Sequence, residues 1–218
     1  MKAKAAIACN VFIAIMTAVA MFMTLTGWMN PASTLMTRGV ANLKFFTVLS
    51  NLFSGIVSVA FAVALVRVRG DFERLSPVLK HLKLMAVTAV TVTFLTVVVL
   101  FCIIFGLRHM FGGANLWFHL VLPLVAIIEY AFVDGPIAPS IPKSALATLP
   151  VVVYGSGYFA NILINGIGEW PHSNDFYGFM SWGYEGAPIV ALVMVVGTWL
   201  IALVLRALNR LICGKQPH

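Results

Sequence analysis

The sequence predicts an all-α, polytopic membrane protein, a bundle of six transmembrane helices in a single domain covering residues 1–218. Composition is the first reason. Hydrophobic residues make up 61% of the chain, charged residues 10%, and the mean hydropathy is +0.99. A soluble domain has about 45–50% apolar and about 25% charged residues. The second reason is that six stretches are long enough to cross a bilayer, which takes about 20 apolar residues.

The six expected helices cover residues 5–27, 43–66, 82–106, 115–133, 145–165 and 187–209. The first begins like a signal peptide, with a basic end and an apolar run. Its run is too long and no small-residue cleavage site follows, so we expect a retained helix. The connections are short and leave no room for a soluble domain.

Basic residues are unevenly distributed between the two sides of this arrangement. If the N-terminus is inside, only Arg38, Lys44 and Arg108 fall outside, and eleven of the 14 basic residues fall inside. The inner set is Lys2, Lys4, Arg67, Arg69, Arg74, Lys80, Lys83, Lys143, Arg206, Arg210 and Lys215. This positive-inside asymmetry predicts that both termini are cytoplasmic. It also explains the net charge of +7 without a nucleic-acid partner.

Three expected helices carry their polar residues on one face, at about 100° per residue. Polar faces turn toward a bundle interior, because exposure to lipid costs free energy. The residues on these faces are Thr47, Ser50, Asn51, Ser54 and Ser58 in the second helix, Asn115, His119 and Glu129 in the fourth, and Tyr154, Tyr158, Asn161 and Asn165 in the fifth. The threonines of the third helix, at 88, 91, 93 and 96, are scattered and predict no such face.

Thr47, His119 and Asn161 each lie about one turn inside the outer ends of their helices. A hydroxyl, an imidazole and an amide at one depth are a possible nucleophile, base and orienting group. Glu129 lies ~15 Å below His119 along the helix axis and cannot orient it. We expect Glu129 to line the cavity or to be structural, with Ser58, at a similar depth, and Tyr154 as candidate partners.

Each polar residue also has a simpler interpretation. Ser54 and Ser58, with Gly55 between them, favour close helix packing. Asn51 and Asn161 could bond each other across an interface. A lone histidine such as His119 is often a satisfied bundle residue. The aromatic, acidic segment 166–186 has two interpretations, an aromatic belt at the interface, which we favour, and a lid over an outward-facing site.

The residues of the second and fourth helices carry a family resemblance. Lys44, Thr47 and Ser50–Asn51 are similar to a K-x-x-T-x-x-N stretch, with Asn51 one place late. Asn115, His119, Pro123 and Glu129 are similar to an N-H-x-x-H-x-x-x-P stretch followed by Glu, with Leu116 in place of the first histidine. Over about residues 40–135 the chain resembles the androgen-induced-gene-type integral membrane threonine hydrolases, which cleave fatty-acid esters of hydroxy fatty acids. It is also similar to compact bacterial six-helix membrane proteins.

This resemblance implies a membrane-embedded lipid or acyl-ester hydrolase in a bacterial cell membrane. Thr47 would attack the ester carbonyl and His119 would accept its proton, in a cavity open to the outer leaflet. Ser50, Asn51 or Tyr158 would bond the oxyanion. The substrate would be a lipid or acyl ester, no metal or other cofactor is implied, and the oligomeric state stays open.

Two alternatives remain at this stage. One is a non-enzymatic protein that binds or transports a lipid or another small molecule, with the polar faces lining its pathway. The other is a metal site on the outer face, drawn from His109, His119, His172, Glu169 and Asp175. No pair among these residues has a tight metal-ligand spacing.

Overall fold

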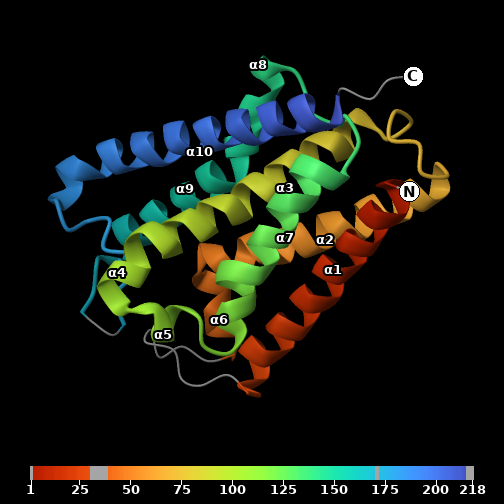
Figure 1. The fold of residues 1–218 in the computed structure, drawn as a ribbon. Coiled ribbons are helices and arrows are strands. Elements are labelled where there is room, and N and C mark those ends of the chain that lie inside the picture. Colours follow the sequence, from red (N-terminus) through yellow and green to blue (C-terminus); the bar gives the residue numbers. More distant parts are fainter. Residues whose placement is uncertain (1, 30–38, 170–171, 215–218) are drawn as a thin grey trace.

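The computed structural model describes residues 2–29, 39–169 and 172–214, and within these ranges every regular element is helical. Six helical spans are long and apolar enough to cross a membrane (Figure 1). They are Lys2–Thr26, Phe46–Arg67, Pro77–Ile104, Ala114–Val133, Ile141–Asn165 and Gly183–Cys213. The predicted all-α class and its six long apolar helices are therefore confirmed.

The spans differ in how regular they are. The first, second and sixth are the single helices α1 (Lys2–Thr26), α2 (Phe46–Arg67) and α10 (Gly183–Cys213), and a short turn η1 (Gly39–Lys44) precedes α2. The third consists of α3 (Pro77–Thr96), the π-helical η2 (Val97–Phe101) and α4 (Cys102–Phe105), followed by α5 (Leu107–Met110). The fourth consists of α6 (Ala114–Leu116), the π-helical η3 (Trp117–Val121), α7 (Leu122–Ile128) and the π-helical η4 (Glu129–Val133). The fifth consists of α8 (Ile141–Ser144), η5 (Ala145–Thr148) and α9 (Leu149–Asn165).

The third span begins at Pro77, earlier than the expected residue 82. Ser76 caps it, since its hydroxyl accepts a hydrogen bond from the Leu79 amide at 3.2 Å. Proline suits the first helical position, because a backbone N–H there would have no hydrogen-bond partner within the helix. α4 is followed by Gly106, whose φ of +81° few other residues adopt and which separates it from α5. Lys83, which we counted with the basic residues of the inner side, lies within α3.

α1 and α2 pack very closely at Gly55. A Cβ atom at this position would lie 2.8 Å from Thr17 Cγ2 of α1. Small residues allow helix backbones to approach in this way. The prediction of close packing around Ser54, Gly55 and Ser58 is confirmed, and both serines are buried.

Four segments gather at one end of the bundle. Gly70 lies against Ala3, Phe72 lies against Gly135, and Lys2 interacts electrostatically with Cys213. Figure 1 accordingly shows the start of α1 and the end of α10 on the same side. The described part of this end carries most of the basic residues that we assigned to the inner side, with Lys83 as the exception discussed below.

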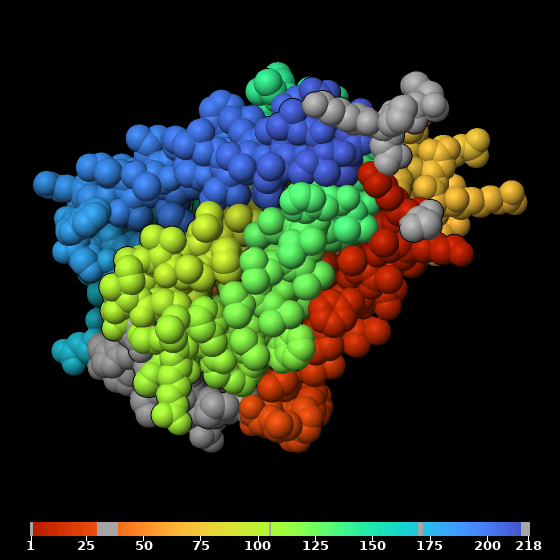
Figure 2. Space-filling view, in the orientation of Figure 1, coloured from red at the N-terminus to blue at the C-terminus, as the bar shows by residue number. Residues whose placement is uncertain are grey.

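Large apolar side chains cover much of the outer surface. Ile56, Ile103 and Ile164 are 60%, 81% and 79% exposed. On the face in Figure 2, α10, the third and fourth spans and α1 lie side by side. Such extended apolar surface is rare on soluble monomers. The surface is compatible with an integral membrane protein.

Candidate functional site

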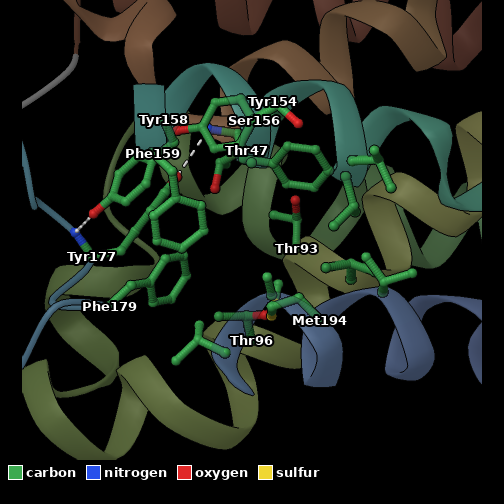
Figure 3. Close-up of a pocket in the computed structure, with 18 of the residues that line it drawn as sticks. Thr47, Thr93, Thr96, Tyr154, Ser156, Tyr158, Phe159, Tyr177, Phe179 and Met194 are labelled. Atoms are coloured by element: carbon green, nitrogen blue, oxygen red, sulfur yellow. Dashed lines mark hydrogen bonds between the residues drawn. The ribbon is translucent and has the colours of Figure 1, made fainter. Parts of the chain in front are cut away.

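A cavity of about 350 Å³ lies between α2, α3, α9, α10 and the segment that precedes α10 (Figure 3). We call it the Thr47 pocket. Most of its wall is apolar, and none of the lining residues that the structure describes is charged. The apolar lining includes Phe46, Val92, Val97, Leu100, Phe101, Val151, Val152, Phe159, Val190, Ala191, Met194 and Val195.

Hydroxyl groups supply the polar part of the wall. They belong to Thr47, Thr93, Thr96, Tyr154, Ser156, Tyr158 and Tyr177. Ser50 connects two of their helices, because its hydroxyl lies 3.0 Å from Thr93 Oγ1 and donates to the Thr47 carbonyl at 3.1 Å. Thr93 and Thr96 belong to the third helix, for which no polar face was predicted, and both line the pocket.

The segment before α10 covers one side of the pocket through Tyr177 and Phe179. Asp175 anchors it, because its carboxylate accepts hydrogen bonds from Tyr158 Oη at 2.5 Å and from the Phe179 and Met180 amides at 2.8 and 2.9 Å. The described part of this segment therefore packs over the pocket, as the lid interpretation required. Trp182, 77% exposed, points outward as a belt residue would.

Tyr177 joins this segment to the start of α2. Its hydroxyl accepts a hydrogen bond from the Phe46 amide at 2.9 Å, and the Tyr177 amide donates to Tyr158 Oη at 3.2 Å. Burial raises the pKa of Tyr177 to about 12. The hydroxyl therefore stays protonated at neutral pH and can donate a hydrogen bond to a ligand.

The structure does not join Thr47 and His119 by a hydrogen bond among the residues it describes. Thr47 lines the pocket, whereas His119 is not among its lining residues. His119 is buried, and its Nδ1 lies 2.7 Å from the Met110 carbonyl oxygen. Because a carbonyl only accepts, Nδ1 carries the hydrogen and Nε2 is left as the acceptor. The two residues still belong to touching segments, since Asn51 donates to the carbonyls of Thr47 and Phe118 at 2.8 and 3.0 Å.

The other predicted site residues have separate roles. Asn51 does not bond Asn161, whose amide donates to Asn174 Oδ1 at 3.1 Å. Tyr154 lines the pocket and donates to the Lys44 carbonyl at 2.6 Å, so it is not the partner of Glu129. Asn115 is half-buried at the start of the fourth span, outside the pocket lining.

Glu129 pairs with Lys83, which the sequence analysis counted only as a basic residue of the inner side. Lys83 Nζ lies 2.5 Å from Glu129 Oε2, and both side chains are buried. The π-helical segments η3 and η4 explain part of this outcome, because a π turn has wider spacing than the α-helical turn assumed for Asn115, His119 and Glu129. Glu129 therefore faces α1 and α3, which agrees with a structural role.

Comparison with protein-family models, curated proteins and solved structures finds no match to this chain. Within the part of the chain that the structure describes, no group of three or more His, Cys, Asp or Glu side chains is arranged to hold a metal ion. The resemblance to the threonine hydrolases stays a prediction.

Proposed function

We propose that this chain is an integral membrane protein of a bacterial cell membrane, with both termini cytoplasmic. The six apolar spans, the exposed apolar side chains and the basic residues gathered at one end support this orientation. Single cysteines at Lys2, Lys215 and Ser173 test it by labelling intact cells with a membrane-impermeant reagent. The cysteine at position 173 should be labelled from outside, and those at positions 2 and 215 only after lysis. Labelling at position 173 only after lysis would contradict the topology.

The protein binds a lipid or another apolar small molecule in the Thr47 pocket. The observation that carries this proposal is a cavity of about 350 Å³ with apolar walls and several hydroxyl groups. Ligand pockets typically measure about 300–1,000 Å³ and combine apolar walls with a few orienting polar groups. The apolar wall suits an acyl chain, and the hydroxyls of Thr47, Thr93 and Tyr158 suit an ester, hydroxyl or carboxyl group.

Binding fits the pocket better than catalysis does. A threonine hydroxyl needs a base within hydrogen-bond reach to become nucleophilic. Among the described residues that line the Thr47 pocket, there is no histidine, acid or lysine. The same residues are well suited to recognise a ligand without transforming it.

Filling the pocket tests binding directly. Gly155 lines the pocket, and a Cβ there meets no heavy atom within 4 Å. Gly155→Phe should weaken binding of a fluorescent polyene fatty acid by about tenfold or more, equivalent to about 1.4 kcal/mol. Gly157 is the matched control, because it lies on the same helix, is exposed and also has open space at Cβ. Equal affinities of the two variants for the probe would contradict binding in this pocket.

Acyl-ester hydrolysis is the second candidate. The observation that favours it is the His119 tautomer, in which Met110 holds Nδ1–H and leaves Nε2 as the acceptor that a general base needs. An acyl-directed fluorophosphonate probe should then label the protein. Thr47→Ala and His119→Ala should each abolish labelling, the double variant should be little worse than either, and Thr47→Ser should retain some. Persistent labelling of Thr47→Ala would exclude Thr47 as the nucleophile.

A further inference from the structure

A buried ion pair lies between α1, α3 and η4, apart from the Thr47 pocket. Lys83 Nζ is 2.5 Å from Glu129 Oε2 and 2.7 Å from Asn10 Oδ1, and it lies 5.0 Å from the centroid of the Phe61 ring. The Asn10 amide also donates to Glu129 Oε1. Lys83 is 3% exposed, and Asn10 and Glu129 are 0% exposed. The Glu129 carboxylate therefore has a donor on each oxygen and a cation to balance its charge.

A second carboxyl group, that of Asp134, is enclosed beside this pair. Asp134 is the first residue after the fourth span, and its amide donates to the Glu129 carbonyl at 2.8 Å. The side chain is 0% exposed, and neither carboxyl oxygen has a hydrogen-bond partner among the described residues. An ionised carboxylate buried without donors or a counter-charge is strongly destabilising. Asp134 therefore lacks the hydrogen-bond donors and the paired cation that Glu129 has.

Lys83, Glu129 and Asp134 together are electrically neutral only if they hold one proton, because Lys83 offsets one carboxylate. Arg206, the other buried cation nearby, donates to the Pro139 carbonyl and forms no ion pair with either acid among the described residues. Burial and the neighbouring Glu129 raise the pKa of Asp134 well above its usual range. A protonated Asp134 is neutral, and its hydroxyl can donate to a carboxylate oxygen.

Other titratable or charged groups face this region from each neighbouring element. They are Cys9 on α1, Tyr130 on η4, and Arg206 and Cys213 on α10. Arg206 donates through Nε to the Pro139 carbonyl at 2.7 Å, and Cys213 donates to the Ala131 carbonyl at 3.5 Å. The Tyr130 hydroxyl is buried without a partner among the described residues. None of these groups donates a hydrogen bond to Asp134.

We propose that Asp134 and Glu129 form a proton-binding site that holds one proton at neutral pH, with Lys83 as its fixed counter-charge. Glu129, bonded on both oxygens, is the ionised member, and Asp134 carries the proton. Buried acid residues of this kind serve as proton sites in membrane pumps and transporters. Asp134 begins the connector of residues 134–140, so local opening of that connector would expose the proton to water. The site is independent of what the Thr47 pocket binds.

Infrared spectroscopy of the purified full-length protein detects such a proton. A protonated carboxylic acid has a carbonyl stretching band separate from the carboxylate bands, and the band shifts to lower frequency in D₂O. The chain has seven acidic side chains. Asp71, Glu73, Glu169 and Glu185 are exposed, and Asp175 accepts three hydrogen bonds from protein donors. Each of these five carboxyl groups is open to water or to protein donors, so Asp134 is the acid side chain from which the band is expected.

The wild-type protein should show the protonated-acid band at pH 7, Asp134→Asn should lose it, and the exposed control Glu169→Gln should keep it unchanged. A wild-type spectrum without the band would overturn the proposal, and this measurement needs no variant to fold. A band that persists at full intensity in folded Asp134→Asn would overturn the assignment of the proton to Asp134.

Discussion

The side-chain nitrogen of Asn51 lies 3.0 Å from the backbone carbonyl oxygen of Phe118, and this hydrogen bond joins α2 to the π-helical segment η3. The same nitrogen donates to the Thr47 carbonyl at 2.8 Å. One amide therefore fixes the start of α2, where Thr47 lines the pocket, against the segment that holds His119. The polar residues on one face of α2 therefore serve partly to join helices.

Replacing Asn51 by leucine should destabilise the protein. The variant keeps the side-chain size but loses both hydrogen bonds, and polar contacts between membrane helices contribute about 0.6–1.7 kcal/mol. The thermal unfolding midpoint of the purified protein in detergent should fall. Asn165→Leu is the control, because Asn165 is exposed near the end of α9 and donates only to Asn161. Equal midpoints of the two variants would show that the α2–η3 bond contributes nothing measurable.

Gly55→Ala should destabilise the protein although alanine is the better helix former. The new Cβ would lie 2.8 Å from Thr17 Cγ2, and overpacking of this kind costs about 1–3 kcal/mol. Gly157→Ala is the matched control. An added Cβ there meets nothing within 4 Å, so the variant should gain up to about 1 kcal/mol of helix propensity. The two substitutions should shift the unfolding midpoint in opposite directions, and a shift of the same sign would contradict close α1–α2 packing.

The sequence predicted the six spans and the close packing at Gly55 because both follow from residue type and local order. Apolar length identifies a spanning helix, and a glycine between two serines indicates a place where backbones approach. The start of the third span was missed. Ser76 and Pro77 form a typical helix start, but they stand in a charged stretch that also fits a loop.

The interior polar cluster could not be predicted from the sequence in the same way. Lys83 is one of several basic residues near the start of α3, and only the tertiary fold shows that its partner is Glu129, 46 residues away. The π-helical segments of the fourth span cannot be read from periodicity, so the face assigned to His119 and Glu129 was defined on the wrong helix geometry. Thr93 and Thr96 were missed as pocket residues because the threonines of the third helix are scattered around it and do not form one face.

The Lys83–Glu129 pair should contribute to stability only as a pair. Lys83→Met leaves Glu129 without its counter-charge, and loss of one partner from a buried ion pair costs about 3–5 kcal/mol. The double variant Lys83→Met/Glu129→Gln should be more stable than the sum of the single effects predicts, with a coupling energy of about 0.5–3 kcal/mol. Lys80→Met is the control, since the Lys80 side chain donates to the exposed Glu73 carbonyl at 3.3 Å.

Denaturant unfolding in mixed micelles of the wild type, Lys83→Met, Glu129→Gln and the double variant measures this cycle. The control should change the free energy of unfolding by no more than about 0.5 kcal/mol. Additive single effects would show that Lys83 and Glu129 do not interact in the folded protein.

Asp134 should make stability decrease as pH rises from mildly acidic to neutral values. Its pKa is raised in the folded protein and is about 3.9 in an unfolded chain. Above that value the unfolded chain releases the proton while the folded protein keeps it, so the folded state binds more protons. The free energy of unfolding then falls with pH until the folded pKa is reached. Asp134→Asn removes this proton difference, so its unfolding midpoint should depend less on pH across the same window.

Thermal unfolding between pH 4 and 8 compares the two proteins, with Asp71→Asn as the exposed control. Identical pH dependence in wild type and Asp134→Asn would mean that Asp134 ionises at its ordinary pKa within the fold.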